Sequence, residues 1–310
     1  MAKRGFLFPG QASQYVGMGA DLYENSDYPI ARQVFNQAND VLGFDIKSVC
    51  FSGPEAQLKQ TRITQPAIFI HSYIVHQIII GRGIKADVVA GHSLGEYTAL
   101  VAADAISFED GLGAVQKRGE LMQQAGQQNP GSMAAIIGMS SEQVVAICHQ
   151  ASAAGVVQPA NFNSPTQIAI SGSVAGVARA MEIADEKGAT KVIPLVVSGA
   201  FHSPLMESAQ AELRNALDSI DFHQPRLPVY ANVTATPERD AAQIKQLLYR
   251  QLTFPVRWVE TIQNMVADGI TEFIELGPGK VLAGLVKRID RKVNVRTVGT
   301  VEEIISLENK

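Results

Sequence analysis

The chain has 310 residues, 46% of them apolar, a length that allows a sizeable core in one large domain or in a large domain with a smaller insert. Its formal net charge of −4 argues against a nucleic-acid-binding protein, because duplex affinity comes mainly from Lys and Arg side chains that neutralise phosphates. Two cysteines, Cys50 and Cys148, cannot form a disulfide scaffold, and no window approaches the roughly 18 uninterrupted apolar residues typical of a membrane span. The apolar run in MAKRGFLFPG (1–10) is too short for a signal peptide, which predicts a cytoplasmic protein.

Two short apolar segments in the first third of the chain predict buried strands. GFLF (5–8) is ended by a Pro-Gly pair and leads into a loop at Gln11, and ADVVAG (86–91) is the second such run. Between them lies a long apolar segment in which Pro66 suits the first turn of a helix that a later glycine would end. The order strand, helix, strand is typical of a parallel sheet.

The second strand runs into Gly-x-Ser-x-Gly, formed by Gly91, Ser93 and Gly95. The residues that follow, LGEYTALVAADAI, have apolar side chains at helical spacing, so strand, tight turn and helix come in the order that a nucleophile elbow needs. Small flanking residues permit the strained turn, and the helix amino terminus points backbone N–H groups toward a developing oxyanion. This context favours Ser93 as a nucleophile over a serine of an ordinary turn.

Another helix is predicted to begin at Ser107, where Ser-x-x-Asp (107–110) resembles a capping box with Asp in place of Glu. The apolar stripe of this helix consists of Phe108, Leu112, Val115 and Met122. Arg118 falls roughly 80° from the centre of that stripe. We therefore expect Arg118 at the border of the buried face.

The pattern between about residues 131 and 197 predicts strand, helix, two strands, helix and strand, which is the order of a ferredoxin-like unit. The expected fold class is α/β. An α/β-hydrolase-like catalytic subdomain with a parallel sheet would comprise residues 1–128 and 198–310. A ferredoxin-like βαββαβ subdomain, residues 129–197, would be inserted into it, with a cleft between the two.

A nucleophilic serine needs a base, and six histidines are available. His71 and His76 fall on different faces of one predicted helix, His92 adjoins the serine, and His149 and His223 are expected on the surface. His202 lies in VSGAFHSP, in a Gly- and Pro-bounded loop directly after the last strand of the insert, and it completes a Ser-then-His order of the α/β-hydrolase kind. Neutral imidazole could take the Ser93 proton and return it to a leaving group.

An acid to orient the imidazole is harder to find. Asp104, Asp110 and Asp185 lie between Ser93 and His202 in sequence, but none is well placed, so a backbone carbonyl would have to fix the tautomer. The sequence has no HExxH, no paired CxxC and no Walker A motif, and GRGIKA (81–86) follows a helix rather than a strand. Metal and nucleotide sites are therefore not expected.

Eight motifs in one order closely resemble the malonyl-CoA:acyl carrier protein transacylases of fatty-acid synthesis, over about residues 4–290. They are FLFPGQASQ, ITQPA, GHSLGEYTAL, KRGELMQ with Arg118, PANFNSP, GAFHSPLM, QLTFPVRW and ELGPGKVLAGLVKR. The resemblance implies that Ser93 carries the malonyl group as an ester and that His202 is the base. It also implies that the backbone N–H groups of Gln11 and Leu94 form the oxyanion hole, and that the main-chain carbonyl of Gln251 orients the histidine.

The resemblance further implies a substrate-binding set of Arg118, Gln65, Asn161, Phe201 and Gln251. Arg118 would hold the free malonate carboxylate as a bidentate pair, which a planar guanidinium can do and a lysine cannot. A phenyl ring before the histidine goes with malonyl over methylmalonyl units in related domains, although Phe201 could equally be simple core filling. One methyl group is worth only about 1 to 3 kcal/mol in a pocket, so incomplete selectivity is expected.

The implied reaction is ping-pong: malonyl-CoA acylates Ser93, CoA leaves, and the phosphopantetheine thiol of acyl carrier protein takes the malonyl group. No permanently bound cofactor is expected, malonyl-CoA is a substrate, and the partners are acyl carrier protein and CoA, without nucleic acid or membrane. A monomer is expected.

Three alternatives stay open: a discrete acyltransferase of a polyketide pathway or a malonate decarboxylase system, a serine thioesterase or esterase that uses the same Ser93 and His202, and a subunit that only docks a carrier protein. Acyl carrier proteins are acidic, and a basic cluster lies near the end of the chain. It consists of Lys287, Arg288, Arg291 and Lys292. A solvated helix face and a docking patch are both possible interpretations of this cluster.

Overall fold

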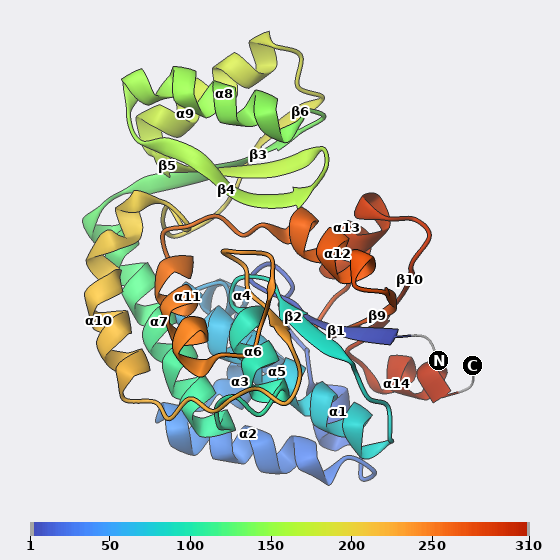
Figure 1. Cartoon of the computed structure of the whole chain (residues 1–310). Coiled ribbons are helices and arrows are strands. Elements are labelled where there is room, and N and C mark those ends of the chain that lie inside the picture. Colours follow the sequence, from blue (N-terminus) through green and yellow to red (C-terminus); the bar gives the residue numbers. More distant parts are fainter. Residues whose placement is uncertain (1–2, 309–310) are drawn as a thin grey trace.

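The structure, a computed structural model, describes residues 3–308 and divides their strands between two sheets (Figure 1). The smaller sheet and its two helices form the top of the molecule in the view of Figure 1, and the larger sheet with its helices lies below. Residues 1–2 and 309–310, which belong to the amino-terminal segment and to the subdomain ranges expected from the sequence, lie outside the described residues.

The larger sheet has six strands in the order β10-β9-β1-β2-β7-β8. Their bounds are β1 (Lys3–Phe8), β2 (Val88–Gly91), β7 (Val229–Tyr230), β8 (Pro237–Glu238), β9 (Ile270–Leu276) and β10 (Asn294–Val298). All neighbours pair in parallel except β7 and β8, so the expected parallel sheet carries one antiparallel edge strand. The physical reason is the short connection between β7 and β8, since only antiparallel strands can be joined by a tight turn.

The register of β1 and β2 brings their carboxyl ends together. Phe8, the last residue of β1, lies opposite Gly91, the last residue of β2. The two apolar runs predicted from the sequence are therefore neighbouring central strands, although the second begins two residues later than expected. The loop after β1 and the turn after β2 leave the sheet at the same edge, where ligands bind in open α/β sheets.

The helix that contains Pro66, α5 (Thr61–Gly81), is longer than the sequence predicts. Pro66 is inside the helix and not in its first turn, so that expectation was wrong. Proline removes one backbone hydrogen bond in such a position, but burial of most of this apolar helix outweighs the loss. Within residues 3–308, α5 alone is long and apolar enough to cross a membrane, and 83% of that window is buried inside the protein, as in the core helix of a globular protein.

The helix α7 (Phe108–Gln128) begins where the sequence predicts it. The Ser107 hydroxyl oxygen accepts the Asp110 N–H at 3.0 Å and so caps the helix. Asp110 does not complete a capping box, because its carboxylate accepts the Ser107 hydroxyl and not the Ser107 N–H. The long helices α5 and α7 pack against each other, and α7 carries Arg118 into the interior of the protein.

The other helices of the larger unit cover its sheet and the α5–α7 pair (Figure 1). They are α1 (Ala20–Glu24), α2 (Pro29–Leu42), α3 (Ile46–Ser52), α4 (Glu55–Leu58), α6 (Gly95–Ala102), α10 (Glu207–Asp218), α11 (Ala241–Gln251), α12 (Trp258–Ala267), α13 (Val281–Ile289) and α14 (Val301–Glu308), with a 3₁₀ turn at Pro204–Met206.

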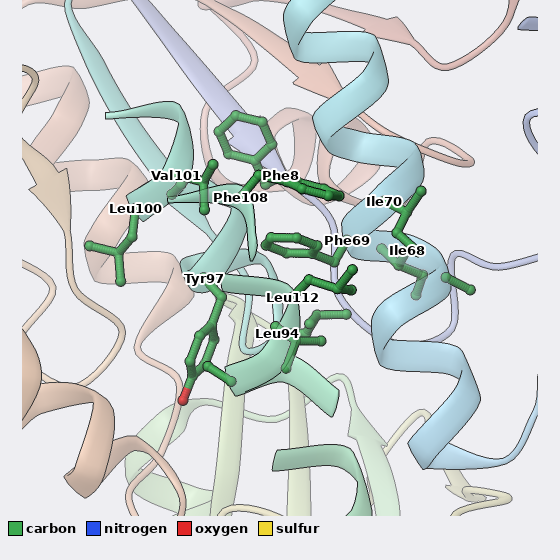
Figure 2. Packing of buried hydrophobic residues seen from close by; sticks show 14 of the residues in the cluster. Phe8, Ile68, Phe69, Ile70, Leu94, Tyr97, Leu100, Val101, Phe108 and Leu112 are labelled. Carbon is green, nitrogen blue, oxygen red and sulfur yellow. The ribbon is translucent and has the colours of Figure 1, made fainter. Parts of the chain in front are cut away.

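The helix α6, which follows Ser93, is embedded in the main core. Figure 2 shows Leu94, Tyr97 and Leu100 together with Phe8 of β1, Phe69 of α5 and residues of α7. The rings of Phe69 and Phe108 stack with their centroids 5.7 Å apart. Close packing on every side gives the turn before α6 a rigid base.

The smaller sheet has the order β4-β5-β3-β6, which is the antiparallel strand order of a ferredoxin-like unit. Its elements are β3 (Gly131–Ile137), α8 (Ser141–Ala151), a 3₁₀ turn at Ser152–Ala154, β4 (Val157–Ser164), β5 (Gln167–Ser173), α9 (Val174–Glu186) and β6 (Lys191–Pro194). The predicted βαββαβ series is confirmed. We propose that the insert has the bounds expected from the sequence, residues 129–197.

Alternation along β3 decides which face of the smaller sheet meets which core. Ala134 and Ile136 pack with α8 and α9 in a core of their own, whereas Met133 belongs to the core of the larger unit. The edge strand β4 is also joined to the segment before α12, since Phe162 N–H donates to the Val256 carbonyl and Val256 N–H to the Ala160 carbonyl, each at 2.9 Å. Both faces of the smaller sheet are covered, which fixes it against the larger unit.

Candidate active site

Ser93 lies at the turn between β2 and α6, with a backbone φ of 52° in the left-handed region. The two flanking glycines are required by close backbone approach. A Cβ on Gly91 would lie 1.9 Å from the Gly95 carbonyl carbon, and a Cβ on Gly95 would lie 2.0 Å from the Phe8 carbonyl oxygen. The sequence Gly-x-Ser-x-Gly is thus the pattern that this sharp turn permits, and the turn lifts the serine above the carboxyl edge of the sheet.

The elbow is held by Asn232, a residue outside the set expected from the sequence. Its side-chain oxygen accepts the Ser93 N–H at 2.6 Å, and its amide nitrogen donates to the Gly91 carbonyl, also at 2.6 Å. Asn232 is fully buried just after β7, the strand next to β2. The only sequence signal for Asn232 was a polar residue just past the end of a short apolar segment.

His202 lies in a turn eight residues after the end of β6, on the segment that leaves the insert. Its Nε2 is 2.8 Å from Ser93 Oγ. Its Nδ1 is 2.8 Å from the Gln251 carbonyl oxygen and 3.2 Å from that of Phe254. Because both of these are acceptors, Nδ1 carries the proton and Nε2 presents its lone pair to the serine hydroxyl.

Burial of the imidazole lowers the pKa of His202 to about 3, and the nearby positive charge of Arg118 acts in the same direction. The hydrogen bonds to the two carbonyls act in the opposite direction but do not outweigh burial. His202 is therefore neutral, and able to accept a proton, well below the usual titration range of a histidine.

The guanidinium of Arg118 reaches the same serine. One terminal nitrogen donates to Gln65 Oε1 at 2.7 Å, and the other donates to Gln251 Oε1 at 2.9 Å and to Ser93 Oγ at 3.0 Å. Arg118 is only 1% exposed, deeper than the border position expected from the sequence. It forms no salt bridge with any residue between 3 and 308. A buried cation with only neutral partners is suited to bind an anion beside Ser93.

Gln11 and Leu94 are the residues whose backbone N–H groups were expected near the serine. Leu94 follows Ser93 directly, and the loop after β1 lies against the elbow, since a Cβ on Gly10 would be 2.4 Å from the His92 carbonyl oxygen. Neither N–H has a hydrogen-bond acceptor within residues 3–308. Both donors are thus available to an oxyanion at the elbow.

Asn161 and Phe201 are less directly connected to Ser93, His202 and Arg118. Asn161 is buried on β4, where it pairs with Val256 in the junction between the two units. Phe201 is 6% exposed and belongs to the main core, so its contacts match core filling as well as they match a pocket wall. Sequence position next to His202 does not by itself place the ring against a substrate.

The remaining histidines lie apart from the serine hydroxyl. His149 and His223 are exposed, as expected, and His71 and His76 are buried in α5. His92 turns away from Ser93, and its Nε2 is 2.8 Å from Asn163 Oδ1. Among residues 3–308, no group of three His, Cys, Asp or Glu side chains is arranged to hold a metal ion.

Glu96, a buried carboxylate three residues after Ser93, is a second residue near the elbow outside the set expected from the sequence. A single charged residue in the otherwise apolar segment LGEYTALVAA was a signal that it has a specific partner inside the protein. Its contacts involve Gln251 and Asn232, both of which touch the elbow.

Comparisons with known proteins agree with this geometry. The acyl transferase domain family matches residues 5–304. The malonyl CoA-acyl carrier protein transacylase of Bacillus subtilis is 45% identical over 305 residues, which cover 98% of this chain and 96% of that protein. The enzyme of the same name from Coxiella burnetii has a structure with a TM-score of 0.95 at 40% identity, covering 99% of this chain and 96% of that one. A malonyl-transacylase in complex with a type II PKS acyl-carrier protein has a TM-score of 0.96 at 39% identity, and each chain is covered in full.

We expect Asn232→Ala to slow acylation of Ser93 by ~10²-fold, because loss of both side-chain bonds lets the strained turn relax and displaces the hydroxyl. The measurement is the burst of p-nitrophenol from p-nitrophenyl acetate. Asn264→Ala is the matched control, since Asn264 donates a similar bond to the Ala235 carbonyl but lies away from the elbow. A folded Asn232→Ala variant with the wild-type burst rate would show that Asn232 is not needed for the position of Ser93.

The low pKa of His202 determines how the acylation of Ser93 depends on pH. Because the pKa of His202 lies below its ordinary value of 6.5, the base form persists as the pH falls below 6.5. The acylation rate constant of the free protein should therefore change by less than ~3-fold between pH 7.5 and pH 5.5, whereas an unperturbed histidine would give a loss of ~10-fold. Burst kinetics across this range test it, with circular dichroism as the check on folding. An acid limb centred near pH 6.5 would contradict the effect of burial.

Proposed function

Because the chain belongs to the acyl transferase family and, within it, to the malonyl CoA-acyl carrier protein transacylases, we propose that it transfers a malonyl group from malonyl-CoA to acyl carrier protein. The malonyl group would be held in between as an ester of Ser93, and the product would supply fatty-acid elongation. The observation that carries the proposal is the position of Ser93 Oγ, 2.8 Å from the base nitrogen of His202 and 3.0 Å from the buried guanidinium of Arg118. A serine hydrolase needs the first of these contacts but not the second.

In the first half-reaction, Ser93 Oγ attacks the thioester carbonyl carbon of malonyl-CoA while His202 Nε2 takes the hydroxyl proton. The carbonyl electron pair moves to the oxygen, which the N–H groups of Gln11 and Leu94 stabilise. When the carbon–oxygen double bond re-forms, the carbon–sulfur bond breaks, and the CoA thiolate receives the proton from His202. The Gln251 carbonyl keeps the imidazole in the required tautomer, so no aspartate is needed.

The second half-reaction repeats these steps in reverse. The phosphopantetheine thiol of acyl carrier protein gives its proton to His202 Nε2 and attacks the ester carbonyl. The bond to Ser93 Oγ then breaks, and the serine regains the proton. Since one thioester is exchanged for another, the site does not need to drive the reaction, and no permanently bound cofactor is required for any step.

Arg118 would recognise the free carboxylate of the malonyl group. The guanidinium offers both terminal nitrogens, each now bonded to neutral acceptors, and a carboxylate provides a stronger, charged partner in the same plane. Gln65 holds one of these nitrogens in place. We propose Asn161 and Phe201 as more distant residues of the malonyl pocket, on the basis of their positions beside the β4 junction and His202.

The surface for the carrier protein is proposed to include the basic cluster of Lys287, Arg288, Arg291 and Lys292. The first two are exposed at the end of α13, and Arg288 donates at 2.6 Å to Oε1 of Gln167, the first residue of β5. The cluster therefore borders both units of the protein. Positive charge here would attract an acidic carrier protein despite the net charge of −4.

We also propose a cytoplasmic location and a monomeric active form. Both cysteines are buried and unpaired, as is usual in a reducing compartment. Ser93, His202 and Arg118 come from one chain, so the site needs no second copy.

Arg118→Ala should lower kcat/KM for malonyl transfer by ~10²-fold or more, because the substrate carboxylate loses its charge-assisted pair. Single-turnover acylation followed by intact mass spectrometry measures the malonyl adduct on Ser93. Lys117→Ala is the control on the same helix, since the Lys117 side chain is 40% exposed and pairs with Glu212. Unimpaired malonyl transfer by Arg118→Ala would overturn the assignment of the carboxylate site, and absence of any malonyl adduct in the wild type would overturn the transferase.

Charge reversal at the basic cluster should raise the KM for carrier protein by ~10-fold and leave acylation by malonyl-CoA unchanged, because rim charges act mainly on association. The double variant Lys287→Glu, Arg288→Glu tests this in steady-state transfer at low and high salt. Lys85→Glu is the control, since Lys85 precedes β2 and so lies at the sheet edge opposite Ser93. An unchanged KM for carrier protein would reject the cluster as the docking surface.

A further inference from the structure

The buried carboxylate of Glu96 has an unusual set of partners. The side chain lies in the first turn of α6 and is 2% exposed. Its Oε2 accepts the Gln251 side-chain N–H at 2.8 Å and the Asn232 backbone N–H at 3.1 Å. It forms no salt bridge with any described residue, including Arg118. A buried carboxyl group that meets only amide donors needs an explanation.

Both N–H protons and the oxygen of the Gln251 side-chain amide form hydrogen bonds. Its nitrogen donates one proton to Glu96 and the other to the Ser93 carbonyl at 3.0 Å, and its oxygen accepts from Arg118. If the amide were turned over, its oxygen would face two acceptors and its nitrogen would face the guanidinium. The network therefore allows one orientation only.

Glu96 Oε2 accepts one of the Gln251 amide protons, so it fixes which side of the amide faces Arg118. The path from the Glu96 carboxyl group through the amide to the guanidinium also keeps the carboxyl group near Arg118 without a direct contact. A direct salt bridge would occupy the guanidinium, and a substrate carboxylate would then have to displace it. The indirect arrangement stabilises the buried cation and leaves it open to a substrate anion.

We propose that Glu96 is a positioning residue that, through the Gln251 amide, holds Arg118 in place for an acyl group that carries a carboxylate. This inference rests on the proposed malonyl transfer. Its consequence is that Glu96 sets the preference for malonyl-CoA over acetyl-CoA, which differs only by that carboxylate. The alternative is a purely structural role, in which Glu96 supports the backbone at Asn232 and affects both substrates equally.

Three substitutions separate these roles. Glu96→Leu removes the acceptor, and Glu96→Asp keeps the charge but withdraws it by one methylene from Gln251. Glu96→Gln places a neutral oxygen where Oε2 now accepts both bonds. Burial raises the pKa of Glu96 to about 7. The glutamine variant has the same shape, so it keeps an acceptor oxygen at this position and removes only the ionised form.

Single-turnover formation of the Ser93 adduct, with malonyl-CoA and with acetyl-CoA, gives kcat/KM for each substrate. For Glu96→Leu and Glu96→Asp we expect kcat/KM for malonyl-CoA to fall ~30-fold or more, mainly through KM, while the value for acetyl-CoA changes by less than ~3-fold. Glu96→Gln should retain the malonyl preference within ~5-fold of the wild type. Equal losses for both substrates, or a Glu96→Gln variant as unselective as Glu96→Leu, would overturn the proposal.

The matched control is Glu275→Gln, which neutralises another buried carboxylate. Glu275 accepts the N–H groups of Leu282 and Ala283 at the start of α13, at 3.0 and 2.8 Å. This variant should lower the melting temperature but keep the ratio of the two substrates. The outcome also separates the two proposals: a wild type without a malonyl adduct refutes malonyl transfer, whereas a wild type that forms it and a Glu96→Asp variant that keeps its preference refute only the role of Glu96.

Discussion

The buried positive charge of Arg118 is the constraint that organises the site. Removing a guanidinium from water is costly unless its donors find acceptors, and here Gln65, Gln251 and Ser93 accept from the two terminal nitrogens. The Nε of Arg118 is buried without a hydrogen-bond partner among the described residues. The ring of Tyr97, with its centroid 5.7 Å from the guanidinium carbon, adds a cation–π contact. These partners come from α5, α11 and the elbow, so the packing of these elements against α7 has to be rigid for the charge to be held.

Gln251 links the charge to the base. Its backbone carbonyl accepts the His202 Nδ1 proton, while its side chain meets Arg118, Glu96 and the Ser93 carbonyl. A carbonyl acceptor fixes the imidazole tautomer without adding a negative charge beside the anion site proposed at Arg118. An aspartate in the same place would compete with a substrate carboxylate for Arg118, which is a physical reason for a dyad under the proposed function.

The insert has a part in the same geometry. The chain leaves β6 and turns directly into the loop that carries His202, and Gln158 of β4 donates to the His202 carbonyl at 2.8 Å and to that of Thr253 at 3.1 Å. The ferredoxin-like unit is therefore attached at the point where the base is positioned. The face of the smaller sheet that carries Met133 packs on the core of the larger unit, and β4 is bonded to the segment at Val256. These two contacts hold the insert, and with it the His202 loop, in a fixed position relative to the elbow.

The sequence by itself determined the two central strands β1 and β2, the helices α6 and α7, the βαββαβ insert, the elbow at Ser93 and, with the family resemblance, the set of residues proposed for the site. These depend on local periodicity, on glycines that permit close backbone approach and on motif order. It placed Pro66 wrongly and Arg118 too near the surface, because burial of a helix depends on what packs around it. Only the tertiary structure showed Asn232 and Glu96, since their partners lie 136 to 155 residues away in sequence and no local pattern records which distant donor a buried oxygen accepts.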